Sequence, residues 1–331
     1  MGFENLCSFI SSLAYADVAS SPATVAIFSR PGYAAIEDVL GGASRIQVDV
    51  GANQADIDLF IAERTQTLTS NSSTLQDIKA ILSEDADGMF LWVSLVIDSI
   101  KKERNDKRRK SAARNMPRGL AGAYSVALDR VLAQDESIKD VALKTLLWIA
   151  NSERPLSEVE LFEALSIEPG MPDLDDEDRI DGNFSLTEDC ADLVISRNGQ
   201  YSLLHVSLKE YLTHPPLKYA EEPIAEYWMK QSKSQAILAE LCLTYLMFDT
   251  FKEHRIEARE DTIVLLEKYP LLEYAAAHWG KHVAKVSVTE KDKIMTLARD
   301  FLTDKYLLQL WGQVMSLAVG ALNERVCSLC T

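Results

Sequence analysis

The sequence predicts a mainly α-helical protein with a partial α/β region at its N-terminus. Three observations support this prediction. Gly and Pro are few, at 14 and 10 in 331 residues, while the helix-forming residues Leu, Ala, Glu and Lys are plentiful. Apolar residues recur at helical spacing over most of the chain from residue 73 onward. Strand-like runs are confined to two short N-terminal segments and to one pair of segments around residue 198.

The chain is acidic, with a net charge of −16 and a pI near 4.8. Because neutralising phosphates requires clustered Lys and Arg, this charge argues against a general affinity for nucleic acid or for an anionic membrane. The 5 cysteines, an odd number spread over a long chain, do not make a disulfide framework and indicate reduced thiols. We therefore expect a cytoplasmic protein.

Apolar segments near the two ends of the chain predict neither secretion nor a membrane anchor. The first follows the leader "MGFEN", which lacks the Lys or Arg of a signal peptide. The second, at 306–322, contains Gln and Gly and is slightly shorter than the roughly 20 apolar residues that span a bilayer. We expect buried helices at 306–322 and no membrane contact.

Residues 1–70 alternate helices with short strands, as in the last part of a parallel α/β domain. The strands are predicted at 24–28, an uninterrupted apolar run, and within 44–50. Two strands do not complete a wound sheet, so only part of an α/β domain is predicted. The helices are predicted at 3–14, 33–40 and 54–67.

Residues 71–135 have a helical pattern, with a break near Asp87 and Gly88 that separates two helices. The stretch 101–118 then holds nine Lys or Arg in eighteen residues. A solvated helix end or linker is the simpler interpretation, and a localisation signal is the alternative.

Residues 136–215 predict a winged-helix domain, because a helix at 138–150 precedes two more helices, a hairpin and a last helix. The hairpin has Asn198-Gly199 as its type I′ turn. Capping boxes are predicted at Ser157 with Glu160, Ser185 with Glu188, and Ser207 with Glu210. Residues 216–331 are predicted to be helical at 219–232, 233–249, 260–267, 270–284, 288–304 and from 305 to the end.

Motifs that carry chemistry are missing from this sequence. It contains no G-x-x-x-x-G-K-[ST] phosphate loop, no G-x-S-x-G nucleophile elbow and no HExxH zinc motif. We therefore expect no catalytic residues, no metal ligands and no enzyme activity. Cys327 and Cys330 form a CxxC pair, but without a second pair we attribute it to chance spacing.

The stretch 153–192 is strongly acidic, with fourteen carboxylates against two arginines. A calcium loop starting at Asp173 would need Gly at its sixth position and Glu at its twelfth, and finds Asp178 and Phe184. A solvated acidic loop is the prediction. Because the winged helix lies in this stretch, we do not expect it to bind DNA.

Three histidines are candidates for a binding role. His278 and His282 lie four residues apart, a spacing that could hold zinc, but no third ligand is evident, so packed or surface histidines are expected. His205 ends a strand just before the amides of a helix N-terminus, which suits an anion. A half-buried histidine bonded to a backbone carbonyl is the alternative, and the local sequence favours it.

Six segments together resemble the NACHT-type signalling ATPases of filamentous fungi, within the STAND class of nucleotide switches. The resemblance covers nearly the whole chain and preserves the order of the segments. Its winged-helix part is similar to that of fungal proteins described as GPI inositol-deacylase-like, without the nucleophile of a hydrolase. The segments are "TVAIFSRPG" (24–32), "QADIDLFIAER" (54–64), "DADGMFLWVSLVIDSI" (85–100), "RPLSEVELFEALSIEPG" (154–170), "LLHVSLKEYL" (203–212) and "YPLLEYAAAHWGKH" (269–282).

The resemblance implies a set of nucleotide-facing residues. It places Arg30 at the sensor arginine facing the γ-phosphate, and Phe90 in the lid motif beside the adenine, where many relatives have proline. It places His205 at the winged-helix histidine that bonds the β-phosphate of ADP. Here Val206 follows that histidine, where several branches have an acidic residue.

The resemblance also divides the chain into four parts: a remnant of the NACHT α/β domain (1–70), a helical lid (71–135), the winged helix (136–215) and a helical domain (216–331). A phosphate loop and a magnesium-binding strand would precede them, and repeats would follow. We therefore expect a non-catalytic scaffold that binds other proteins, including an upstream NACHT half or a downstream repeat domain. ATP or ADP would bind only if a missing segment or a partner supplied the phosphate loop. The alternative is a fragment of a complete ATP- or GTP-dependent switch.

Overall fold

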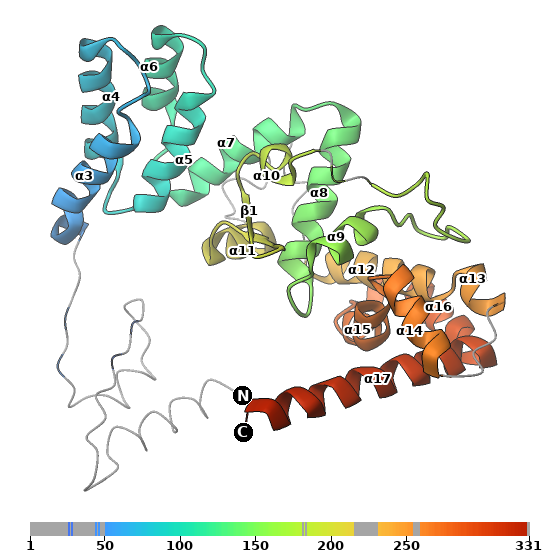
Figure 1. Ribbon diagram of the computed structural model, residues 1–331. Helices are drawn as coiled ribbons and strands as arrows, with labels where there is room; N and C mark the ends of the chain where they lie inside the picture. Colours follow the sequence, from blue (N-terminus) through green and yellow to red (C-terminus); the bar gives the residue numbers. More distant parts are fainter. Residues whose placement is uncertain are drawn as a thin grey trace, which may run out of the picture. The chain divides into compact units, whose positions relative to one another are not determined.

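The computed structural model confirms a mainly α-helical protein (Figure 1). The chain divides into two compact units, Met1–Asn53 and Gln54–Thr331. The described residues are 50–180, 182, 184–214, 231–253, 259–329 and the single positions 26, 28, 44 and 46; side chains at 231, 232, 259 and 319–329 are left out. The helices predicted at 3–14 and 33–40 lie outside these residues, as do the two N-terminal strands apart from single positions. The short 3₁₀ helix η1 (Val50–Asn53) ends the first unit.

The segment 54–132 folds into consecutive helices. The predicted break between two of them is confirmed: Asp87 and Gly88 have φ angles of 46° and 74°, a left-handed conformation that ends α4 before α5 starts. The side chain of Trp92 is fully buried and its indole Nε1 donates to the carbonyl of Pro117 at 2.9 Å, which ties α5 to the start of α7. The helices are α3 (Gln54–Arg64), α4 (Ser72–Asp85), α5 (Phe90–Lys101), α6 (Asp106–Asn115) and α7 (Leu120–Leu132).

Helix α6 lies wholly within the basic stretch 101–118, so the middle of that stretch is a helix rather than a linker. Asn105 caps this helix, because its side chain accepts a hydrogen bond from the amide of Arg108 at 2.9 Å. Ala113 faces the interior, while most of the charged side chains remain in solvent. The predicted solvation of the stretch is thus correct, although its backbone is regular.

The segment 136–213 has the predicted order of helices, hairpin and helix. The strands pair antiparallel, with Val194 opposite Leu203 and Arg197 opposite Gln200. Asn198 and Gly199 have φ angles of 53° and 72°, which confirms the type I′ turn. Among the described residues this is the one sheet. The elements are α8 (Glu136–Asn151), α9 (Glu158–Leu165), α10 (Leu186–Asp189), β1 (Val194–Arg197), β2 (Gln200–Leu203) and α11 (Val206–Thr213).

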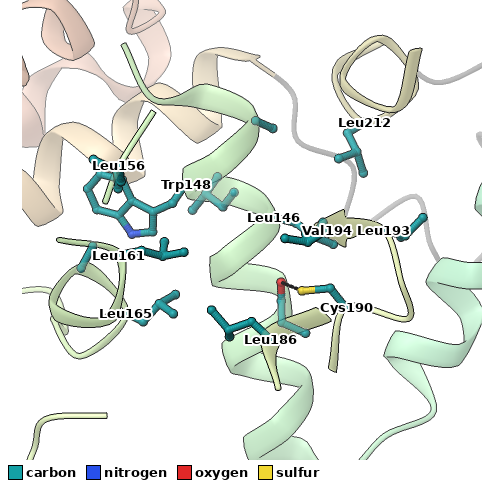
Figure 2. Packing of buried hydrophobic residues seen from close by; sticks show 14 of the residues in the cluster. Leu146, Trp148, Leu156, Leu161, Leu165, Leu186, Cys190, Leu193, Val194 and Leu212 are labelled. Atoms are coloured by element: carbon teal, nitrogen blue, oxygen red, sulfur yellow. Dashed lines mark hydrogen bonds between the residues drawn. The ribbon is translucent and has the colours of Figure 1, made fainter. Parts of the chain in front are cut away.

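Helix α8 lies at the centre of the core of this segment. Figure 2 shows side chains from α9, α10 and the hairpin gathered around it, among them Leu161, Leu186 and Val194. Cys190 belongs to this core, and its Sγ lies 3.7 Å from the carbonyl oxygen of Ala142 in α8. Burial of these apolar side chains is the main stabilising contribution to the segment.

The three predicted capping boxes have different outcomes. The first is complete, because Ser157 Oγ accepts from the amide of Glu160 at 3.3 Å while Glu160 accepts from the amide of Ser157 at 2.7 Å. At Ser185 the serine half is present, since its side chain accepts from the amide of Glu188. The third prediction is wrong. Helix α11 begins at Val206, and its N-cap residue is His205 rather than Ser207.

The C-terminal segment consists of helices close to the predicted ones, and the sequence analysis missed the short α13. The pair of buried helices expected at 306–322 is wrong, because this range lies within one continuous helix, α17. Most of the helix predicted at 219–232 lies outside the described residues. None of the helices, over the residues described, is long and apolar enough to cross a membrane. The helices are α12 (Gln231–Leu246), α13 (Asp249–Glu253), α14 (Arg259–Lys268), α15 (Leu272–Ala284), η4 (Val288–Glu290), α16 (Lys291–Thr303) and α17 (Lys305–Leu329).

A chain of hydrogen bonds joins α12 and α15 to the end of α8. His282 is fully buried; its Nε2 lies 2.9 Å from the hydroxyl of Tyr274 and its Nδ1 lies 2.7 Å from Oε1 of Gln235. Gln235 in turn donates to the carbonyl of Asn151 at 3.3 Å, and the amide of Glu153 donates to the Tyr274 hydroxyl at 3.0 Å. We call this set the polar joint.

The polar joint is satisfied by a neutral histidine. Gln235 uses its amide nitrogen on Asn151, so its oxygen accepts from Nδ1–H of His282. Nε2 then accepts from the hydroxyl of Tyr274, which itself accepts from the amide of Glu153. A second proton on the ring would remove the hydrogen bond that this hydroxyl donates to Nε2. Burial lowers the pKa of His282 to about 4 and outweighs the opposite effect of Glu153. The packed role expected for this histidine is confirmed.

The buried histidine makes stability fall in mild acid. The unfolded chain binds a proton at His282 near pH 6.5, whereas the folded chain binds it near pH 4, so stability falls as the pH drops through this range. Between about pH 7 and about pH 5 this group lowers the free energy of unfolding by about 2 kcal/mol. Urea unfolding at several pH values should show a flatter profile for His282→Gln. The exposed His214→Gln should keep the wild-type profile, and an unchanged slope in His282→Gln would contradict the assignment.

Two helical glycines differ in what surrounds them. A Cβ on Gly122 in α7 would overlap the ring of Pro117, whereas one on Gly280 in α15 would meet nothing within 4 Å. We expect Gly122→Ala to destabilise the protein by about 1 to 3 kcal/mol through overpacking. Gly280→Ala should stabilise it by about 0.5 to 1 kcal/mol through helix propensity. Thermal unfolding of the two variants checks both signs, and equal shifts would contradict the packing at Pro117.

Candidate functional site

His205 forms the cap of α11 instead of occupying a core. Its Nδ1 accepts from the amide of Ser207 at 3.2 Å and lies 2.8 Å from the Ser207 hydroxyl. That hydroxyl is 2.8 Å from the hydroxyl of Tyr124, a buried residue of α7. Because Nδ1 accepts, the neutral ring carries its proton on Nε2. The ring is therefore held in one orientation by two helices.

This geometry corrects the local prediction for His205. The side chain is exposed rather than half-buried, and it bonds a backbone N–H rather than a carbonyl. An anion at the start of α11 would meet the Nε2–H of the imidazole, since the ring already holds the Ser207 amide. An anion site here would therefore depend on Nε2–H of His205 as its donor, and not on the amide of Ser207.

His205 lines an open pocket of about 300 Å³. Lys209, one helical turn further along α11, lines the same pocket. Apolar side chains form much of its wall, charged groups come from Lys209, Glu153 and Arg154, and His205 adds an imidazole. The lining residues are Ile149, Ser152, Glu153, Arg154, Pro155, Leu156, Leu161, Tyr201, Ser202, Leu203, His205, Val206 and Lys209.

Arg154 is fixed in the pocket wall by a bidentate ion pair. Its two terminal nitrogens donate to the two carboxylate oxygens of Glu160 at 2.9 and 2.6 Å. Burial alone would raise the pKa of Glu160, but hydrogen bonds from Arg154 and Ser157 outweigh it and lower that pKa. The guanidinium also lies 5.3 Å from the centre of the Tyr274 ring, so Arg154 contacts the polar joint.

Glu153 also belongs to both the pocket and the joint. Its backbone amide donates to Tyr274, and its carboxylate pairs with Lys285 just after α15. The pocket wall is thus connected to the C-terminal helices through two consecutive residues. Sequence analysis missed Tyr124 and Arg154, because no local pattern signals their contacts with Ser207 and Tyr274, which lie far away along the chain. It also missed Lys209, although a cation four residues after His205 on a predicted helix is a local signal.

Of the other two predicted nucleotide-facing residues, the structure describes only Phe90. Phe90 starts α5 and packs edge-to-face on Phe60, with 5.6 Å between ring centres. It remains 38% exposed and is not among the residues lining the His205 pocket. Arg30 lies outside the described residues. A common cleft for Arg30, Phe90 and His205 therefore stays a prediction.

The acidic stretch is anchored by the second of its two arginines. Glu163 is buried in α9, accepts from the hydroxyl of Tyr245 in α12 and pairs with Arg179. Asp176 lies 3.4 Å from the same arginine. The residues between 175 and 178 are exposed, as predicted for a solvated loop. Over the described part of the chain, no group of three or more His, Cys, Asp or Glu is placed to hold a metal ion.

In sequence the chain is similar to the vegetative incompatibility protein HET-E-1 of Podospora anserina, with 25% identity over 338 residues. The similarity covers 93% of this chain and supports the broad family to which the resemblance points. The chain spans about a quarter of the length of HET-E-1, because the match covers 24% of that protein. No family model and no solved structure matches.

Removing the arginine of the pocket wall should destabilise the protein. Arg154→Met leaves the largely buried carboxylate of Glu160 without its cation, and we expect a loss of about 2 kcal/mol, since the arginine is partly exposed. Arg197→Met, at an exposed position of β1, should change stability by less than about 0.5 kcal/mol. Urea unfolding measures both. Arg154→Met combined with Glu160→Gln should recover part of the loss, and a double variant that loses more would contradict the ion pair.

Proposed function

We propose that this chain is a regulatory, protein-binding module of a NACHT-type signalling switch, without nucleotide hydrolysis of its own. Two lines of support converge on it. Six ordered segments resemble that class of switch, and nearly the whole chain is similar to a vegetative incompatibility protein. We further propose that α8 to α11 are a winged helix, that α4 to α7 are the lid, and that α12 to α17 form the helical domain.

The observation that carries this proposal is the shared position of Glu153 and Arg154. Both line the pocket beside His205, and both contact α15 or the residue after it, through Tyr274 and Lys285. A phosphate that entered the pocket would meet Nε2–H of His205 and the ammonium of Lys209. It would also draw Arg154 away from Glu160 and Tyr274. A change at the pocket would therefore act directly on the packing of the helical body.

In this proposal the nucleotide is gripped by residues outside these 331. The sequence has no G-x-x-x-x-G-K-[ST], whose backbone amides and lysine would surround the phosphates. Phosphoryl transfer depends on that grip and on its metal ion, so we propose that the module senses a nucleotide held elsewhere. Its partners are other proteins, among them an upstream NACHT half or a downstream repeat domain. We place it in the cytoplasm, in a response of the vegetative-incompatibility kind.

The effect of nucleotide on thermal stability tests this proposal. A ligand that binds the folded state raises the melting temperature, by an amount equivalent to about 2.7 kcal/mol at 100 times its Kd. We expect millimolar Mg-ADP or Mg-ATP to leave the melting temperature of the chain unchanged. The same result is expected for His205→Ala and for His214→Ala, a matched variant at the other end of α11.

The alternative function is a nucleotide-dependent switch of which this chain is one fragment. It predicts an upward shift with Mg-ADP that His205→Ala abolishes and His214→Ala preserves. That result would overturn the proposal of a module without a nucleotide of its own. A transcript that extends upstream into G-x-x-x-x-G-K would also favour the switch.

A further inference from the structure

Helix α6 presents two chemically different faces. Its inner face is held by the buried Ala113 and by the ion pair of Lys110 with Asp77 of α4 at 2.5 Å, while Arg109 pairs with Asp106 of the same helix at 3.0 Å. The hydroxyl of Thr69 also donates to Asp106 at 2.9 Å. These contacts fix which side of α6 faces solvent.

The outer face of α6 combines a serine with three cations. Lys107, Arg108 and Arg114 are exposed, and over the described residues none of them lies within ion-pair distance of a carboxylate. Arg114 is close enough to Asp77 of α4 to help Lys110 lower the pKa of that carboxyl. Ser111 lies four residues after Lys107, three after Arg108 and three before Arg114. At about 100° per residue these four side chains project from the same side of the helix.

The hydroxyl of Ser111 is accessible to a modifying enzyme. The side chain is exposed, and its Oγ accepts one hydrogen bond, from Nδ2 of Asn115 at 3.1 Å. Helix α6 has Ala113 as its one fully buried side chain. A helix with so little buried apolar surface opens at low cost, so a kinase can engage this segment in an extended form.

We infer that Ser111 is a phosphorylation site for a protein kinase that selects basic residues before its acceptor. Arg108, Arg109 and Lys110 immediately precede it and give the complementary charge for a kinase cleft lined with carboxylates. The inference goes beyond the proposed function and does not depend on it.

The reaction uses Mg-ATP bound to the kinase. Oγ of Ser111 attacks the γ-phosphorus, and a new oxygen–phosphorus bond forms. The bond from the γ-phosphorus to the bridging oxygen breaks, and ADP leaves with that oxygen. The hydroxyl proton passes to a carboxylate of the kinase.

The outer face of α6 retains the phosphate once it is attached. Phosphoserine carries about −1.5 to −2 charges at pH 7 and offers three acceptor oxygens. Lys107, Arg108 and Arg114 are within helical reach of it and can form charge-assisted hydrogen bonds. Elsewhere in a chain of net charge −16 the same group would mostly meet carboxylates. Phosphorylation would thus reduce the charge of this face from +3 to about +1.

The test uses the full chain with Mg-ATP and the catalytic subunit of cyclic-AMP-dependent protein kinase. Intact mass should show one added phosphate, and peptide mapping should place it on Ser111. Ser111→Ala should abolish the addition while leaving the melting temperature unchanged. Arg108→Gln should lower the initial rate roughly tenfold, the equivalent of one charge-assisted hydrogen bond. Arg197→Gln, which replaces an exposed arginine of β1, should leave the rate unchanged.

A second measurement tests retention of the phosphate. Phosphorus NMR should show a second ionisation below its ordinary value of about 6 in the phosphorylated chain, because cations favour the dianion. The shift should shrink in Lys107→Gln and in Arg114→Gln. Phosphate on another residue, full incorporation into Ser111→Ala, or no incorporation into the wild-type chain would overturn the inference.

Discussion

The uncharged imidazole of His282 connects the hairpin-containing segment to the C-terminal helices through hydrogen bonds. His282 accepts one hydrogen bond and donates one, and each of its two partners is itself bonded to the backbone at the end of α8, at Asn151 and at Glu153. Apolar burial supplies most of the stabilising free energy but has no direction, whereas this series of donors and acceptors fixes α12, α15 and the residues after α8 in one register. The same hydrogen bonds therefore also position the pocket wall, because Glu153 and Arg154 follow closely after α8.

Charge compensation in this acidic chain is local. Three glutamates close to the core each have a cation of their own: Glu153 has Lys285, Glu160 has Arg154 and Glu163 has Arg179. Burial raises the pKa of a carboxyl, and at Glu153 and Glu160 the cation and its hydrogen bonds outweigh burial and lower the pKa. At Glu163 burial is the larger effect, so its pKa is raised despite Arg179. The remaining negative charge lies in exposed positions, where water screens it.

The sequence predicted the regular elements well because their signals are local. Helix spacing, the Asn198-Gly199 turn and the Ser157–Glu160 box each involve residues a few positions apart, and the structure confirms them. Ser207 with Glu210 matched the same box pattern, but the N-cap of α11 is His205, whose ring accepts the hydrogen bond from the Ser207 amide.

The pocket and the polar joint could not be predicted from the sequence, for a different reason. Their contacts join residues up to 132 positions apart, as for Glu153 and Lys285, and no periodic pattern encodes such a pair. The polar joint was hidden further because Gln235, Tyr274 and His282 look like ordinary helix residues. His205 could be singled out from its neighbours, but its orientation depends on Tyr124, which is 83 residues from Ser207.

The two cysteines whose side chains the structure describes, Cys190 and Cys242, can report on the opening of the core. Cys190 and Cys242 are unpaired and fully buried, and burial raises the pKa of both thiols. A thiol reagent needs both access and a thiolate, so neither sulfur reacts while its helices stay packed. The rate at which each thiol is alkylated would therefore measure how often the protein opens locally. Cys190 would report on the region around α8, and Cys242 on α12. Comparing their two rates would reveal whether those regions come apart together or one after the other.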